Sequence, residues 1–122
     1  FDTQIIASLE TLSREQSNNG YWPQLLGHLH FFHGRYEESI SQYEESFRRC
    51  GKPVELGNMS RAYYELHDYY KARYYAEKSI DMDPTDDNPH CVLTNSLMEM
   101  ELFVTGGIAL RLTREQAIRL PE

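Results

Sequence analysis

The stretch HGRYEES at residues 33–39 returns in outline as HDYYK at residues 67–71, at a constant offset of 33 residues that takes Tyr36 to Tyr69. The same offset relates further pairs: Leu26 with Met59, Gly27 with Ser60, His30 with Tyr63, Ser39 with Ala72, Ser46 with Ser79, and Phe47 with Ile80. Self-similarity at this period is typical of proteins that stack one small structural unit several times. We therefore expect two copies of one unit between residues 26 and 84.

Length and composition indicate one acidic domain that spans residues 1–122. A chain of 122 residues can bury a hydrophobic core without a metal ion or a disulfide. The net charge of −7 argues against nucleic acid and anionic membranes as partners, because both attract basic proteins, and it favours basic or neutral partners. No apolar run approaches the roughly 18 residues that a membrane span needs, and no secretory signal is visible. We expect a cytoplasmic protein.

Apolar residues at helical spacing predict two helices before the first repeated motif. Asp2 can cap the first of them, and residues 17–20 end it; its apolar face carries Ile5, Ile6, Leu9 and Leu12. The second helix begins at residues 21–23, where a proline in the first turn is tolerated. Because it is apolar around much of its circumference, we expect neighbouring helices to cover it on several sides.

The two repeated units extend this pattern. After Gly34, one helix face carries Tyr36, Ile40, Tyr43 and Phe47. Ser39 and Ser46 lie where a bulky side chain would push the paired helix away. The second unit runs from Val54 to Met82, with its turn at residues 67–68.

The sequence after Pro84 matches the repeated pattern poorly. We expect a solvated turn at residues 85–89, a helix from Cys91 to Phe103 that residues 105–107 break, and a last helix that ends at Pro121. This makes about seven helices in all. Residues 87–122 are read either as a divergent third repeat or as a capping pair of helices.

The arrangement resembles the tetratricopeptide repeat, a helix–turn–helix unit of about 34 residues with a set order of tryptophan, leucine, glycine, tyrosine, alanine, phenylalanine and proline. In the first copy, Leu26 and Gly27 match, and the tyrosine, alanine and phenylalanine positions hold His30, Ser39 and Tyr43. In the second copy, Tyr63, Ala72 and Pro84 match, and Ser60 replaces the glycine. Trp22 misses the tryptophan position, which Pro23 and Leu56 occupy. The resemblance covers roughly residues 20–86.

This resemblance implies an all-α fold, a right-handed superhelix of antiparallel helix pairs. Residues 1–19 would form an N-terminal helix, residues 20–52 the first repeat and residues 53–86 the second. In this family the first helices of the repeats line a concave face that binds peptides. The inward positions of the family fall on Tyr21, Gln24, His28, Phe31, Phe32, Asn58, Arg61, Tyr64, Glu65, Asn95, Met98 and Glu99.

The predicted function is therefore a protein–protein interaction scaffold or adaptor. It would bind a peptide or a helical segment of another protein, and we expect no cofactor. One subclass of the family holds the C-terminal carboxylate of heat-shock chaperones with lysines, asparagines and an arginine. Asn58 matches one clamp asparagine, but Gln24, His28, Asn88 and Val92 replace other members of the clamp, including its cations. We exclude that ligand for this reason.

Other chemistry has weak support in the sequence. His28, His30 and His33 lie close together, but only His30 and His33 share a helix face, so we expect packing or turn roles and no metal site. The aspartates of residues 81–87 lack the glycine and the glutamate of a calcium loop. Cys50 and Cys91 fit no redox or zinc pattern and are expected to be free thiols. No catalytic motif is present, and we predict that the chain is not an enzyme.

Two alternatives to the adaptor remain. The chain begins with Phe1 rather than methionine and ends abruptly at Glu122, so we expect a fragment or a processed chain. It could then be a structural piece of a larger repeat subunit, which self-associates or docks end-on through its first or last helix. The other alternative is a small secretion-type chaperone, a group that includes short acidic stacks of this size.

Overall fold

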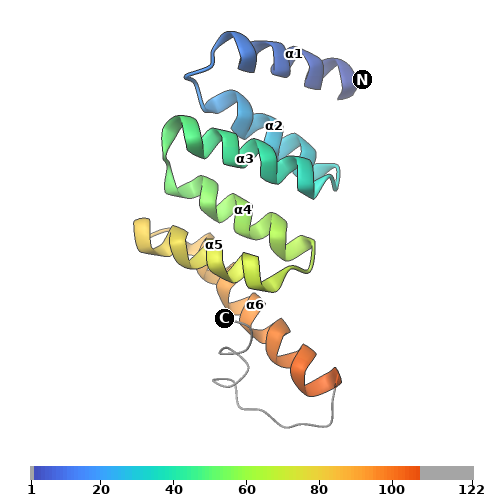
Figure 1. Ribbon diagram of the computed structural model, residues 1–122, viewed down its shortest axis with the longest axis vertical. Coiled ribbons are helices and arrows are strands. Elements are labelled where there is room, and N and C mark those ends of the chain that lie inside the picture. Colours follow the sequence, from blue (N-terminus) through green and yellow to red (C-terminus); the bar gives the residue numbers. More distant parts are fainter. Residues whose placement is uncertain (1, 108–122) are drawn as a thin grey trace.

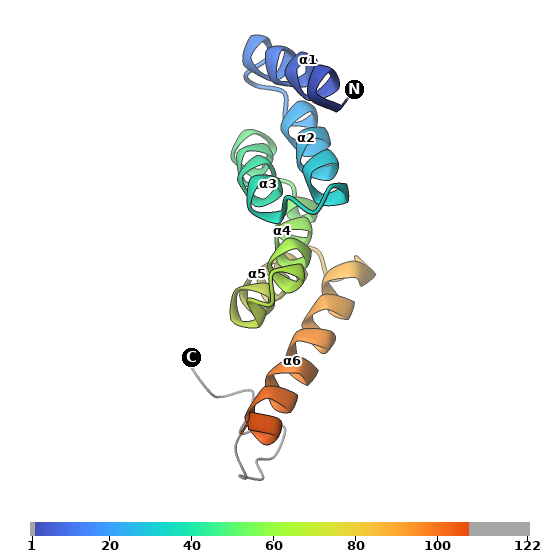
Figure 2. The same cartoon turned by 90° about the vertical axis from the view of Figure 1, so that its right-hand side faces the viewer.

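The computed structural model describes the backbone of residues 2–107 and the side chains of residues 3–101, and all regular secondary structure in this part of the chain is helical. Its six helices are α1 (Asp2–Glu15), α2 (Tyr21–Phe32), α3 (Tyr36–Cys50), α4 (Pro53–Glu65), α5 (Tyr69–Met82) and α6 (Asp87–Gly107). They stack in chain order from α1 to α6 (Figure 1). Turned by 90°, the stack has α3 and α5 on one side and α2 and α6 on the other (Figure 2). The all-α prediction is confirmed, and the predicted seventh helix lies outside the described residues.

The turns of the two helix pairs, α2–α3 and α4–α5, have equivalent backbone geometry at the offset of 33 residues. The first turn is closed by bonds from Gly34 N to Phe31 O at 3.0 Å and from Arg35 N to His30 O at 2.8 Å. The equivalent bonds of the second turn run from His67 N to Tyr64 O at 2.9 Å and from Asp68 N to Tyr63 O at 3.0 Å. Gly34 and His67 both have a positive φ, at 75° and 63°. The repeated motif therefore corresponds to a repeated turn.

The core lies between the two pairs. It contains the buried residues Ile40, Tyr43, Leu56, Met59 and Ala62, and it is flanked by the half-buried rings of Phe31, Tyr36, Phe47, Tyr63 and Tyr75. Ser39 and Ser46 are buried, as their small size predicts. Ser46 Oγ lies 2.8 Å from Gly20 O, and at the equivalent positions Ser79 Oγ donates to Pro53 O at 3.1 Å. Each serine thus connects the second helix of a pair to the start of the first.

Helix α1 is attached mainly at its C-terminal end. Leu9 is buried, whereas Ile5 of the predicted apolar face is 37% exposed. Arg49 Nη1 of α3 lies 3.2, 3.4 and 3.0 Å from the carbonyl oxygens of Ser13, Gln16 and Asn19. A cation at these carbonyls compensates the negative end of the α1 dipole and occupies backbone groups that lack partners within the helix.

Helix α6 differs from the prediction at both ends. It begins at Asp87 rather than Cys91, because Pro89 is accommodated in the first helical turn, where a proline costs no hydrogen bond. The predicted turn at residues 85–89 is wrong in its second half. The helix also continues through Gly106 and Gly107, which weaken a helix without forbidding it.

The register of α6 follows the repeat only in part. Its start lies 33 residues after Val54, near the start of α4, so the third copy begins at the expected place. The position equivalent to the turn residues Gly34 and His67 is Met100, which is helical and 2% exposed. Buried methionine has no reason to adopt the left-handed conformation that a turn requires, and α6 runs on as a single helix. None of the six helices is long and apolar enough to cross a membrane.

Candidate functional site

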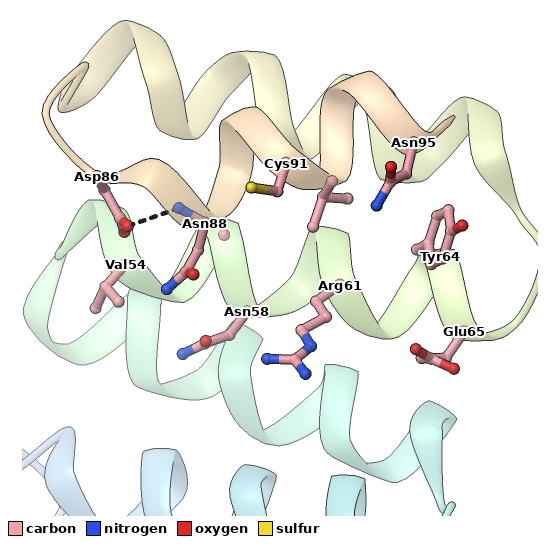
Figure 3. Close-up of a pocket in the computed structure, with 11 residues that line it drawn as sticks. Val54, Asn58, Arg61, Tyr64, Glu65, Asp86, Asn88, Cys91 and Asn95 are labelled. Atoms are coloured by element: carbon pink, nitrogen blue, oxygen red, sulfur yellow. Dashed lines mark hydrogen bonds between the residues drawn. The ribbon is translucent and has the colours of Figure 1, made fainter. Parts of the chain in front are cut away.

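An open groove of about 350 Å³ lies between α4 and the start of α6 (Figure 3). The α4 wall is formed by Val54, Gly57, Asn58, Arg61, Tyr64 and Glu65. The opposite wall is formed by Asp86, Asn88, Cys91, Val92 and Asn95. Helical spacing explains the grouping, because residues three or four apart in a helix share one face. The groove therefore combines carboxamides, a guanidinium, a phenol and a few apolar side chains.

The start of α6 is fixed by a side-chain cap. Asp86 Oδ1 accepts a hydrogen bond from the backbone N–H of Asn88 at 3.1 Å, which Figure 3 shows as a dashed line. Such a bond satisfies one of the backbone donors that have no partner at a helix N-terminus. The cap positions Asn88 and Cys91 opposite α4.

Asn58 is held by a buried carboxyl group. Its Nδ2 donates to Glu55 Oε1 at 3.1 Å, and Glu55 Oε2 lies 2.9 Å from Ser46 Oγ of α3. Glu55 is only 1% exposed. Buried polar groups of this kind fix the orientation of their partners, because leaving one unsatisfied is costly. The carboxamide of Asn58 is thus tied through Glu55 to the preceding helix pair.

Arg61 supplies the positive charge of the groove. Its guanidinium carbon lies 5.3 Å from the centre of the Phe31 ring on α2, a distance at which a cation is attracted to an aromatic face. Within the described residues Arg61 forms no ion pair. The guanidinium hydrogens of this side chain are therefore available to a ligand.

Tyr64 lies at the other end of the α4 wall, and Tyr69 at the start of α5 packs against it. The Tyr64 and Tyr69 rings meet edge to face, with centroids 5.4 Å apart, and Tyr69 Oη lies 2.7 Å from His67 Nδ1. Partial burial raises the pKa of the Tyr64 hydroxyl, and the charges of Glu99 and Glu65 raise it further. The pKa of Tyr69 is raised by the same causes, burial first and Glu99 next. Burial and the nearby carboxylates thus both disfavour the phenolate form of these two tyrosines.

The groove unites only some of the residues predicted from the sequence. Five predicted binding residues line it: Asn58, Arg61, Tyr64, Glu65 and Asn95. Six others do not line it: Tyr21, Gln24, His28, Phe31, Phe32 and Met98. The last predicted residue, Glu99, follows Asn95 by one helical turn on α6.

The predicted α2 positions lie outside the groove, which is lined by residues of α4 and of the start of α6, and their environments differ. Phe31 packs against the core and meets Tyr36 edge to face at 5.1 Å. His28 Nδ1 lies 2.8 Å from Tyr43 Oη, and burial lowers the pKa of this histidine. Phe32 is 81% exposed.

The sequence reasoning missed Val54, Gly57, Asp86 and Cys91, and it considered Asn88 and Val92 only as clamp positions. The 33-residue offset could have located α6. It makes Asp87 and Asn88 equivalent to Val54 and Glu55, near the start of α4, and so predicts a helix start before Cys91. Glu55 was also missed, because a buried glutamate is rare unless it is paired.

The structure places the remaining candidates, the turn histidines and the two cysteines, as follows. Arg35 Nε of the turn donates to His30 Nδ1 at 2.9 Å, and Cys50 and Cys91 are exposed free thiols. In the part of the chain that the structure describes, no three His, Cys, Asp or Glu side chains are grouped to hold a metal ion.

Comparisons with known proteins add no family to this description. No protein-family model matches the chain, and no curated protein sequence is significantly similar to it.

Proposed function

We propose that this chain is a protein-interaction module that binds a segment of another polypeptide in the groove between α4 and α6. The observation that carries the proposal is the set of polar side chains on facing helices, Asn58 and Arg61 on one wall and Asn88 and Asn95 on the other. A carboxamide both donates and accepts hydrogen bonds, so it can pair with the N–H and C=O groups that any extended peptide offers. The guanidinium adds a site for a carboxylate or a carbonyl oxygen.

The arrangement of the helices supports the same proposal. Two antiparallel helix pairs with equivalent turns, followed by a helix that starts in the same register, fit the first helices of a tetratricopeptide-type superhelix. In such a stack α2, α4 and α6 line the concave face. The mixed character of the groove, with aromatic, amide and charged groups, suits a peptide ligand.

A peptide-display selection tests the proposal. The full chain is used to select 12-residue peptides from a random library, and the affinity of the enriched peptides is measured by fluorescence anisotropy. We expect Arg61→Ala and Asn95→Ala, one on each wall, to weaken binding by about tenfold or more, because central interface residues commonly contribute more than 1 kcal/mol. The matched control is Arg14→Ala on α1, which removes the same charge outside the groove and should change the affinity less than about twofold.

Two results would overturn the proposal. One is a selection that enriches no peptide, and the other is an enriched peptide whose affinity is insensitive to both groove variants. Far-UV circular dichroism of each variant shows whether the helices are retained. Tyr64→Ala is preferable to Phe31→Ala as a third variant, because Phe31 packs against the core and its removal would weaken the fold itself.

A second candidate function is a structural segment of a larger repeat assembly. The observation that favours it is Ile5 on α1, an apolar side chain that is 37% exposed at the end of the stack. End-on docking would cover this residue. Size-exclusion chromatography with light scattering tests it, since a strict monomer at high concentration contradicts docking between copies of the chain.

A further inference from the structure

We infer that the Tyr64 end of the groove binds a cationic side chain, lysine or arginine, of the partner segment. This inference rests on the proposed function and names one feature of the ligand. The subsite is defined by Tyr64, Tyr69, Glu65 and Glu99, and its features are two aromatic rings and two carboxylates.

The aromatic rings provide the first half of the subsite. Tyr64 lines the groove, and Tyr69 packs edge to face against it at 5.4 Å, so the pair forms a rigid corner. A lysine or arginine side chain is attracted to the face of such a ring and can lay its apolar stem along it.

The fold already uses this contact elsewhere. Arg61 lies over Phe31, Lys71 over Tyr63 and Lys78 over Tyr74, each with the cation between 5.3 and 5.5 Å from the ring centre. Within the described residues no cation of the chain covers Tyr64 or Tyr69 in the same way. The aromatic corner at the groove is thus open to a cation from a partner.

The carboxylates provide the second half. Glu65 lines the groove, and Glu99 lies one turn beyond Asn95 on the α6 wall. In residues 3–101 neither carboxylate forms an ion pair. Burial first, and then the charges of Glu99 and Glu65, raise the hydroxyl pKa of both Tyr64 and Tyr69, in agreement with carboxylates near the aromatic corner.

The charges of the neighbouring residues restrict where a cation can bind. Arg61 lies about one helical turn from Glu65, roughly 6 Å along α4, and would repel a cation placed in the middle of the groove. His67, the other basic group nearby, is hydrogen-bonded to the Tyr69 hydroxyl. The groove is therefore polar along its length: Arg61 favours an acidic or carbonyl group, and the Tyr64 end favours a basic side chain. The net charge of −7 strengthens the attraction at low salt.

A titration with small probes tests the subsite independently of any partner. The ¹⁵N-labelled chain is titrated with N-acetyl-lysine N-methylamide and with the norleucine analogue, which has nearly the same stem and no charge. We expect saturable ¹H–¹⁵N shifts at Tyr64, Tyr69 and Glu99 for the lysine probe, with an affinity about fivefold higher than for norleucine. Glu99→Gln should weaken the lysine probe about threefold or more, and Tyr64→Ala should weaken it further, whereas Tyr64→Phe should retain it. The matched control, Glu10→Gln on α1, removes an equal charge away from the groove and should leave the affinity unchanged.

The outcomes distinguish this inference from the proposed function. Equal shifts with lysine and norleucine, or equal effects of Glu99→Gln and Glu10→Gln, overturn the cation subsite. If peptides are selected that depend on Arg61 but contain no enriched lysine or arginine, the proposed function stands and the subsite is wrong. If the lysine probe binds at Tyr64 and Glu99 and no peptide is selected, the subsite stands and the proposed function is wrong.

Discussion

The helix pairs α2–α3 and α4–α5 share one backbone arrangement, but different residues pack between their helices. In the first pair, Gly27 faces Tyr43, and a Cβ atom at residue 27 would lie 2.6 Å from the Tyr43 ring. At the equivalent positions of the second pair, Ser60 and Ala76 are both buried and both small. The first pair thus combines a glycine with a large ring, whereas the second pair combines two small residues. The comparison shows that one backbone arrangement accommodates different combinations of side chains between its helices.

The turns of the two pairs also have one backbone conformation but different residues. The first turn has glycine at the residue with positive φ, and the second has His67. Glycine adopts this conformation without steric cost, whereas a residue with a side chain is strained by about 1–2 kcal/mol. The second turn adds a compensating contact, because the Asp68 side chain accepts a hydrogen bond from Lys71 N at 3.2 Å and caps α5. Arg35 at the equivalent place in the first turn caps nothing with its side chain.

The largest effect on stability is expected when the first pair receives the residues that pack in the second pair. Tyr43→Ala should lower the free energy of unfolding by about 3–5 kcal/mol, because it leaves a cavity where a residue that is 2% exposed had packed. Gly27→Ser alone should cost about 1–3 kcal/mol through overpacking against the same ring. The double variant has the residues of the second pair. We expect its loss of unfolding free energy to be smaller than the sum of the two single losses by about 1 kcal/mol or more. Urea denaturation followed by circular dichroism measures all three.

Additive effects of the two substitutions would contradict the inferred contact between residue 27 and the Tyr43 ring. If the double variant lies within about 0.5 kcal/mol of the sum, Gly27 is not required by the Tyr43 ring. Tyr43→Phe is the matched control, since it keeps the ring and removes only the hydroxyl that lies 2.8 Å from His28 Nδ1. It should show the same clash with Gly27→Ser.

A smaller effect, of opposite sign in the two pairs, is expected at the turns. Gly34→Ala should destabilise the fold by about 1 kcal/mol, since nothing lies within 4 Å of the added Cβ and only the backbone at φ 75° resists it. His67→Gly relieves the same strain and should stabilise by up to about 1 kcal/mol. Urea denaturation measures both changes as shifts of the midpoint, provided that the dependence of the unfolding free energy on urea concentration stays constant.

Two variants control this prediction. Gly51 also has a positive φ and open space around its Cβ position, so Gly51→Ala should behave like Gly34→Ala. His67→Asn tolerates the left-handed conformation and lacks the imidazole. If His67→Gly and His67→Asn both destabilise, the contact of His67 with the Tyr69 hydroxyl outweighs the backbone strain.

The fold could be predicted from the sequence where local rules and the repeat agreed. Apolar spacing and the 33-residue offset located α3 and α5 closely, and the small size of Ser39 and Ser46 predicted their burial. The start of α6 was misjudged because residues 85–89 contain strong turn formers, and a proline in a first helical turn has the same local signal as one in a loop.

The candidate site was harder to predict than the fold. Which inward positions form a groove depends on how far each helix lies from the next, and this follows from packing and not from spacing along one helix. Phe31 and Tyr64 occupy equivalent positions at the 33-residue offset, yet Phe31 packs against the core and Tyr64 lines the groove. The contact of α6 with both α4 and α5 brought Asn88 and Asn95 opposite Asn58. No pattern within α6 alone contains that information.

The smallest expected effect concerns one position where the pairs have opposite charges, Glu45 in α3 and Lys78 in α5. The Glu45 carboxylate accepts hydrogen bonds from Arg48 and Arg49, which lower its pKa to about 2. Since the pKa is lowered in the folded state, the contribution to stability is present above the ordinary value of 4.5 and is lost as the pH falls toward 2. Glu45→Gln should therefore cost less than about 1 kcal/mol at pH 7, and the difference from wild type should shrink by about pH 3.

Lys78→Gln is the matched control, because lysine stays charged over this range and its effect should not change with pH. A Glu45→Gln difference that is equal at both pH values would show that the carboxylate does not act through the arginines. The contrast has a structural reason. Arg49 reaches the end of α1, so the first pair needs an acid that orients it, whereas Met82 stands at the equivalent position of the second pair and is exposed. The pair that contacts α1 therefore uses the arginine and its carboxylate to hold the end of that helix.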